Sequence, residues 1–123
     1  MGEIFGGGVD QILVSRVEEA CKKDSFLRTS YSERERELIR ERNSRAATNF
    51  AGKEAVVKAF GAGFTGGIIP REIEILRREN GAPYVELAGK ARSFAESHQI
   101  GEIHISLTDT KEYASAFVVA SMR

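Results

Sequence analysis

The chain has 123 residues, 41% of them hydrophobic, which matches a single domain over residues 1–123. Its 18 basic and 18 acidic residues give a formal net charge of 0, which excludes a strongly basic protein that binds nucleic acid. No apolar run is long enough to cross a bilayer, so we expect no membrane partner. The single Cys21 cannot form an internal disulfide, so we expect a cytoplasmic location and interpret Cys21 as a packing residue.

The first half of the chain is predicted to contain one strand followed by three helices. The expected bounds are 4–12 for the strand and 13–23, 33–41 and 44–60 for the helices. Ser32 and Glu35 form a capping box that opens the second helix, which is heavily charged and expected to be exposed. Gly61 provides a C-cap for the third and longest helix.

The second half is predicted to form two hairpins with a helix between them. Asn80-Gly81 is a strong turn signal for the first hairpin, and residues 109–111 form the turn of the second. The expected bounds are 71–78 and 84–87 for the first pair of strands, 89–98 for the helix, and 102–108 and 112–121 for the last pair. The resulting order β-α-α-α-β-β-α-β-β favours an α+β fold with an antiparallel sheet.

Asp10 stands at the end of the apolar, glycine-rich first strand, where an acidic residue adds little to solubility. One interpretation is a helix N-cap for the segment that follows. The other is a ligand of a hard divalent cation, because such cations prefer carboxylate oxygens.

The long helix carries Glu54 and Lys58 one turn apart on a stripe of otherwise small side chains. The stripe consists of Ala47, Ala51, Glu54, Lys58 and Gly61. An ordinary surface pair at i,i+4 is one explanation. The apolar neighbours favour the other, a site where a ligand or a second backbone approaches closely. Lys53 lies off the stripe, so we expect Lys53→Ala to lower turnover or ligand affinity less than Lys58→Ala does.

Alternation places His104, Ser106 and Thr108 on one face of the strand over 102–108. A solvated polar face explains this pattern, as does a row of donors for a phosphate or a partner subunit. The segment 61–66 fits G-x-G-x-x-G, but it follows a helix and leads into a strand. A dinucleotide-binding fingerprint requires the reverse, so we exclude that function.

Together these segments resemble the small holo-acyl-carrier-protein synthases, a family of 4'-phosphopantetheinyl transferases. The matching segments are GVD at 8–10 with Arg16 after it, FAGKEAVVKAFG at 50–61, NGAPYVEL at 80–87 and HISLTDTKEYA at 104–114. Each piece alone is common, but the ordered set covers almost the whole chain.

The resemblance implies a 4'-phosphopantetheinyl transferase-like α+β fold and a homotrimer with active sites between subunits. Its reaction moves 4'-phosphopantetheine from coenzyme A to a serine of an apo acyl carrier protein and releases 3',5'-ADP. The family's Mg²⁺-binding carboxylates map onto Asp10 and Glu54, and its phosphate-binding lysine maps onto Lys58. These three are the catalytic residues that the resemblance implies. Either Glu54 or a metal-bound water would accept the serine proton.

The resemblance also implies a coenzyme A site and a surface for the carrier protein. The coenzyme A residues would be Lys58, Gly61, Asn80, Gly81, Pro83, His104, Ser106, Thr108 and Thr110, those from His104 onward coming from a neighbouring subunit. Arg16, Lys23 and Arg28 would receive the acidic helix of the carrier protein. A solvated helix face is the alternative explanation of this basic segment.

Two positions depart from the family pattern. Many members have arginine, associated with the 3'-phosphate, where this chain has Asn49, and some have histidine in place of Asp109. The sequence therefore leaves the 3'-phosphate contacts unassigned. Asn49 also leaves an alternative function, namely a module that binds coenzyme A or a nucleotide but has no transfer activity. A purely structural oligomer is a third possibility, which the joint presence of Asp10, Glu54 and Lys58 argues against.

The last strand is apolar on both sides, which predicts an oligomer, because a small domain has little left to cover the second side. One side carries Ala114, Ala116, Val118 and Ala120, and the other carries Tyr113, Ser115, Phe117 and Val119. The alanine side would let subunits approach closely, so Ala116→Arg is expected to break the assembly.

Overall fold

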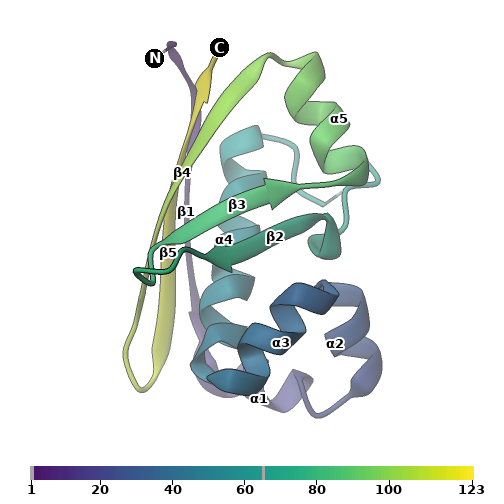
Figure 1. Ribbon diagram of the computed structural model, residues 1–123, viewed down its shortest axis with the longest axis vertical. Coiled ribbons are helices and arrows are strands. Elements are labelled where there is room, and N and C mark those ends of the chain that lie inside the picture. The colour runs from purple at the N-terminus through teal and green to yellow at the C-terminus, as the bar shows by residue number, and fades with distance from the viewer. Residues whose placement is uncertain (1, 65) are drawn as a thin grey trace.

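Two antiparallel sheets flank a long helix in the computed structural model, which describes residues 2–64 and 66–123 (Figure 1). The larger sheet has the order β1-β5-β4, built from β1 (Ile4–Leu13), β5 (Tyr113–Met122) and β4 (Ile100–Asp109). The smaller sheet pairs β2 (Ile73–Arg77) with β3 (Pro83–Leu87). The α+β fold with antiparallel sheets is therefore confirmed.

The helices lie at both ends of the molecule and along its centre (Figure 1). They are α1 (Val14–Ala20), α2 (Asp24–Ser30), α3 (Glu33–Glu41), α4 (Ser44–Phe60), the short 3₁₀ helix η1 (Pro70–Glu72) and α5 (Gly89–Ser97). The sequence predicted all of these except α2 and η1, and it extended the first helix beyond Ala20. Thr65, part of the rejected glycine motif, lies outside the described residues.

Glycines let β1 lie directly against α4. A Cβ atom added at Gly8 would stand 2.0 Å from the carbonyl oxygen of Ala55, and one at Gly6 would stand 2.1 Å from that of Ala59. Only glycine on the strand opposite alanine on the helix permits this approach. The glycine-rich segment thus fixes the position of α4, and with it the side chains that α4 carries.

Two expected turns have the backbone conformation that glycine favours. Gly61 ends α4 with φ of 76°, and Gly81 lies in the hairpin between β2 and β3 with φ of 91°. The capping box of Ser32 and Glu35 at the start of α3 is also present. These local signals were readable because each depends on residues close in sequence.

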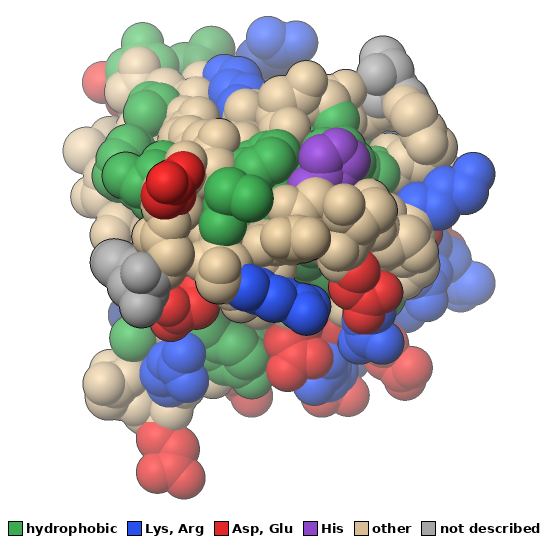
Figure 2. All heavy atoms as spheres, turned by 90° about the horizontal axis from the view of Figure 1, so that it is seen from above, with side chains coloured by type: hydrophobic (Ala, Val, Ile, Leu, Met, Phe, Trp, Pro, Cys, Tyr) green, Lys and Arg blue, Asp and Glu red, His purple; other side chains and the backbone are tan. Residues whose placement is uncertain are grey.

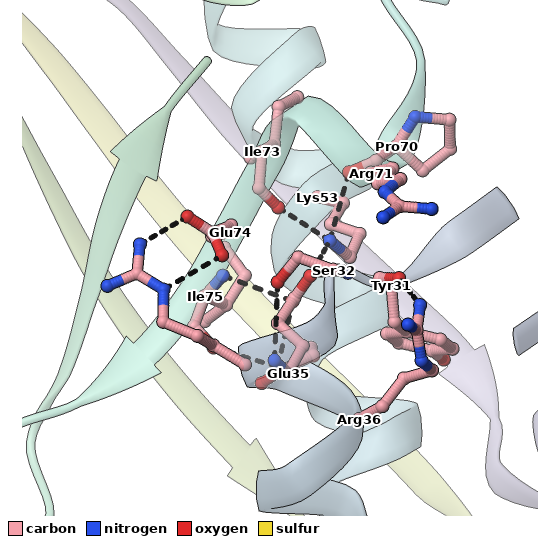
Figure 3. A network of polar contacts seen from close by, with 12 residues as sticks. Tyr31, Ser32, Glu35, Arg36, Lys53, Pro70, Arg71, Ile73, Glu74 and Ile75 are labelled. Atoms are coloured by element: carbon pink, nitrogen blue, oxygen red, sulfur yellow. Dashed lines mark hydrogen bonds and ion pairs between the residues drawn. The ribbon is translucent and has the colours of Figure 1, made fainter. Parts of the chain in front are cut away.

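The expectation of an exposed α3 is wrong for Glu35, which is fully buried (Figure 3). Its carboxylate accepts hydrogen bonds from Lys53 Nζ at 2.6 Å, Asn49 Nδ2 at 3.0 Å and the backbone N–H of Ile75 at 3.1 Å. Lys53, also fully buried, donates to the carbonyl oxygens of Pro70 and Ile73 as well. This network joins α3, α4 and β2 at the centre of the molecule.

The expected role of the alanine side of β5 is also wrong. Ala114, Ala116, Val118 and Ala120 are all buried inside the chain. The reason is that α4 crosses this face closely, so the small side chains accommodate the chain's own helix. The opposite side is the open one, with Tyr113 and Phe117 exposed by 43% and 52%. Ala116→Arg would therefore disrupt the core of the chain rather than a subunit contact.

Charged side chains of both signs are mixed with hydrophobic ones at the end that carries both termini and α5 (Figure 2). This mixture agrees with the formal net charge of 0. None of the helices within residues 2–64 and 66–123 has the length and apolar character that a membrane span requires.

Candidate active site

Asp10 lies within β1 and reaches toward α4. Its Oδ1 accepts a hydrogen bond from Lys58 Nζ at 3.0 Å, and Lys58 also donates to the carbonyl oxygen of Val9 at 2.9 Å. Its Oδ2 is buried and has no hydrogen-bond partner among residues 2–64 and 66–123. The N-cap interpretation of Asp10 is wrong, because the N-cap position of α1 is Leu13. Burying a carboxylate oxygen without a hydrogen-bond partner costs free energy, so this atom is a candidate for contact with a ligand.

Glu54 stands one turn before Lys58 on α4 and is half-buried. Burial raises the pKa of the Glu54 carboxyl, the nearby Asp10 carboxylate raises it further, and Lys58 opposes both effects. The two carboxylates are therefore near enough to repel each other. The surface-pair explanation of Glu54 and Lys58 is not supported, because Lys58 forms its ion pair with Asp10 on another element.

Mg²⁺ is the metal that the family resemblance implies for Asp10 and Glu54. The described residues contain no group of three or more His, Cys, Asp or Glu side chains that could hold a metal ion. Mg²⁺ typically takes one or two carboxylates and fills its other positions with waters and substrate phosphates. The unpartnered Asp10 Oδ2 supplies a free ligand atom for such an ion.

His104, Ser106 and Thr108 do not meet Asp10 within one chain. Strand pairing places Asp10 beside Ala116 and Leu107, whereas Ser106 pairs with Phe117 on the other face of the sheet. The three polar side chains are exposed on that outer face. They can serve a site containing Asp10 only if that site belongs to another copy of the chain.

Thr110 and Asn80 both shape turns through their side chains. Thr110 Oγ1 accepts hydrogen bonds from the backbone N–H groups of Tyr113 at 3.0 Å and Glu112 at 3.3 Å. Asn80 Oδ1 accepts one from the N–H of Ala82 at 3.0 Å. These residues can position a ligand through the backbone, but their side-chain oxygens already have partners.

Gly81 and Pro83 line a cavity of about 250 Å³ that also contains three arginines. These are Arg42, Arg45 and Arg77. No sequence motif joins these arginines, because they lie on a loop, in the first turn of α4 and at the end of β2. The family's arginine position holds Asn49, which is fully buried and cannot touch a ligand in solvent.

The expected carrier surface is less basic than its sequence indicates. Arg28 forms an ion pair with Asp24 at 2.7 Å. Among residues 2–64 and 66–123, neither Arg16 nor Lys23 has an ion-pair partner. Arg16 lies at a cavity of about 410 Å³ whose other lining side chains include Phe26, Phe50 and Tyr113. Arg16 therefore combines a free charge with an apolar hollow beside it.

Comparison with known proteins places this geometry in a family. A sequence model of the 4'-phosphopantetheinyl transferase superfamily matches residues 7–118. A holo-[acyl-carrier-protein] synthase of Lachnoclostridium phytofermentans is 48% identical over 119 residues, covering 97% of both chains. The crystal structure of the synthase from Neisseria meningitidis superposes with a TM-score of 0.88 at 27% identity, covering 96% of this chain and 98% of that one. The synthase of Bacillus anthracis, crystallised in complex with CoA (3',5'-ADP), gives a TM-score of 0.81 at 28% identity and covers 98% of both chains.

Proposed function

Because the chain belongs to the 4'-phosphopantetheinyl transferase superfamily, among its holo-acyl-carrier-protein synthases, we propose that Asp10, Glu54 and Lys58 form its transfer site. The enzyme transfers 4'-phosphopantetheine from coenzyme A to a serine of an apo acyl carrier protein and releases 3',5'-ADP. The observation that carries the site assignment is the buried, unpartnered Asp10 Oδ2 beside Glu54 and Lys58.

Phosphoryl transfer depends on positioning and on charge stabilisation more than on covalent chemistry by the protein. Asp10 and Glu54 would hold Mg²⁺, which offsets pyrophosphate charge when bound. Lys58 is about half exposed and pairs with only one oxygen of Asp10, so its ammonium group can turn toward a phosphate oxygen. Glycine contacts between β1 and α4 hold these side chains in register.

The serine hydroxyl must lose a proton as it attacks the β-phosphorus. Glu54 is half-buried beside Asp10 in the proposed site, and its carboxylate can accept a proton. Glu54 and a water molecule are the two candidates for this role. Asn49, which kept a non-catalytic module open, is a buried structural residue and therefore does not argue against transfer.

Transfer is tested by incubating the protein with an apo acyl carrier protein, coenzyme A and Mg²⁺ and measuring the intact mass of the carrier. A mass increase of one phosphopantetheine that requires all components is expected. Chelation of divalent metal should abolish the increase, and readdition of Mg²⁺ should restore it. An unchanged carrier mass would contradict the assignment.

A homotrimer is supported by the open face of the larger sheet. Its apolar side chains are exposed, namely Val9 by 59%, Phe117 by 52%, Tyr113 by 43% and Leu13 by 39%. Contiguous exposed apolar side chains of this kind mark interaction surfaces. A neighbouring copy on this face would also bring His104, Ser106 and Thr108 near another chain's site.

The free Cys21 supports a cytoplasmic location for the enzyme.

The trimer is tested by light scattering, which should give three times the 13.6 kDa mass of one chain. Phe117→Glu should lower the measured mass and reduce transfer with it. Ile69→Glu is the matched control, since Ile69 is 47% exposed but lies outside the sheet. An active monomer at assay concentration would contradict a site shared between subunits.

A further inference from the structure

The cavity between the start of α4, the β2–β3 hairpin and the end of β4 has a strongly positive lining. Arg42, Arg45 and Arg77 line it together with Gly81, Pro83 and Asp109. Three guanidinium groups therefore share about 250 Å³ with a single carboxylate. Like charges brought this close destabilise one another unless a counter-charge is present.

The chain itself supplies little of that counter-charge. Arg45 pairs with Glu41 at 3.0 Å, and that glutamate side chain is 70% exposed. Arg42 and Arg77 form no ion pair with any residue in the described ranges 2–64 and 66–123. Burial lowers the pKa of Arg77, the charge of Arg45 lowers it further, and the buried Glu35 opposes both effects from outside the cavity lining. The cavity is therefore short of negative charge.

Arg77 is held in place by Asn49. Its Nη2 donates to Asn49 Oδ1 at 2.9 Å and more weakly to Thr48 Oγ1 at 3.4 Å. The other end of the Asn49 amide donates to Glu35 Oε2 at 3.0 Å and to the carbonyl oxygen of Ile75 at 2.8 Å. An amide can donate to a carboxylate through its nitrogen and accept from a guanidinium through its oxygen. Asn49 thus ties Arg77 to the buried network around Glu35.

We propose that Arg77, positioned by Asn49, binds the 3'-phosphate of coenzyme A in this cavity, supplying from β2 the positive charge that position 49 lacks. The ligand class is a phosphate monoester, which the planar fork of arginine recognises well. Gly81 and Pro83 form one wall of the cavity and leave space for the attached nucleoside beside the phosphate. This assignment rests on the proposed function, since it concerns the same donor substrate.

The position of the cavity relative to Glu54 indicates which carboxylate site it serves. Arg45 and Glu54 are separated along α4 by about two and a half turns, so they stand on opposite sides of the helix. A single coenzyme A cannot reach both within one chain, because α4 lies between them. The arginines of one copy would therefore bind the nucleotide whose pyrophosphate lies at Asp10 and Glu54 of the next copy.

Steady-state kinetics with coenzyme A and with 3'-dephospho-coenzyme A test the proposal directly. Arg77→Gln removes the charge but retains a donor for Asn49. We expect it to raise the KM for coenzyme A by about 10- to 100-fold, the value of one charge-assisted hydrogen bond, with kcat nearly unchanged. The KM for the dephospho donor should stay the same. Arg92→Gln, an exposed arginine on α5, is the control.

Two further variants separate positioning from folding. Asn49→Ala should raise the KM for coenzyme A but add little in combination with Arg77→Gln, because both act on one contact. Arg77→Lys should restore part of the affinity, because it keeps the charge without the planar fork. Circular dichroism and unfolding curves confirm that each variant tested is folded.

The results distinguish the proposed transfer function from the proposed role of Arg77. Absence of transfer by the unmodified protein would contradict the proposed function. Transfer with equal KM for the two donors, or an equal loss for both in Arg77→Gln, would overturn the role of Arg77. A loss confined to coenzyme A would support it.

Discussion

Helix α4 carries two lysines whose surroundings differ in almost every respect. Lys53 and its partner Glu35 are both 0% exposed, the ammonium group donates three hydrogen bonds, and both carboxylate oxygens accept at least one. Lys58 and its partner Asp10 are 52% and 12% exposed, and one carboxylate oxygen of Asp10 has no hydrogen-bond partner within the part of the chain that the structure describes. Both pairs join α4 to another element, yet only the second leaves hydrogen-bonding capacity unused.

Helix α4 therefore carries two kinds of residue: Lys53, which stabilises the fold as a scaffold, and Lys58, which belongs to the candidate site. Lys53 and Glu54 are neighbours in sequence, but Lys53 is buried in the core whereas Glu54 is only half-buried and lies near Asp10. A buried ion pair whose hydrogen bonds are complete holds elements together. A carboxylate that is partly desolvated and incompletely paired is available for a ligand.

Lys53→Met should produce the largest effect, on stability. Removing one partner of a buried pair leaves Glu35 uncompensated, so the free energy of unfolding should fall by about 3–5 kcal/mol in urea denaturation. Lys90→Met on exposed α5 is the control, and a loss below about 1 kcal/mol for Lys53→Met would refute the scaffold role. The expectation that loss of Lys53 lowers transfer less than loss of Lys58 stays a prediction, whereas for stability we expect the reverse order, because Lys53 is buried and paired with Glu35.

The deficit of Lys53→Met should also depend on pH. Burial raises the pKa of Glu35, and in this variant Lys53 no longer opposes that shift. A carboxyl whose pKa is higher in the folded state stabilises the fold at low pH and loses that contribution as pH rises. The deficit should therefore shrink as pH falls toward about 4.3, the ordinary pKa of glutamate. A deficit that grows on acidification would have the wrong sign.

Asp10→Asn should affect transfer and leave the fold intact. We expect kcat/KM to fall by about 10²–10³-fold, as for other groups that stabilise charge at a reacting centre. The free energy of unfolding should change by less than about 1 kcal/mol, because the pair with Lys58 is partly solvated. Transfer near the normal rate at saturating Mg²⁺ would remove Asp10 from the site.

Lys58→Ala should have a smaller effect on the same assay. We expect a loss of about tenfold, below the 10²–10³-fold typical of a desolvated donor, since Lys58 is half exposed. Lys90→Ala is the matched control on another helix. Equal losses for the two variants would leave no reason to place Lys58 at the phosphates.

Arg16→Glu should have the smallest effect, confined to the carrier protein. Its KM for the carrier should rise by about fivefold or less at low salt, in line with an exposed charge pair, and the difference should fade as salt increases. The KM for coenzyme A should stay constant, with Arg92→Glu as the control. A changed KM for coenzyme A would instead move Arg16 to the nucleotide site.

Helix caps and turns were predictable from the sequence, whereas contacts between residues distant in sequence were not. The cap at Ser32, the end of α4 at Gly61 and the turn at Gly81 each depend on a few adjacent residues. The burial of Glu35 depends on Lys53 and β2, far along the chain, and the face that β5 presents depends on α4. No pattern in the sequence joins such distant residues.

The candidate site divides in the same way. The apolar or small neighbours made Asp10, Glu54 and Lys58 candidates, and the family resemblance selected them; the structure brings the three side chains together. Arg77 was missed because its meaning depends on Asn49, which is distant in sequence and itself buried. The sequence indicated Asn49 as a departure from the family pattern, but the contact between Asn49 and Arg77 is visible only in three dimensions.

The most direct test of the separation between scaffold and site is Glu54→Gln, measured for transfer and for unfolding on the same sample. The account predicts a carrier whose intact mass stays largely unmodified under conditions where the unmodified enzyme completes the reaction. It also predicts a free energy of unfolding equal to or above that of the unmodified enzyme, because an unfavourable half-buried charge is removed. Normal transfer, or a loss of transfer explained by unfolding, would contradict the account.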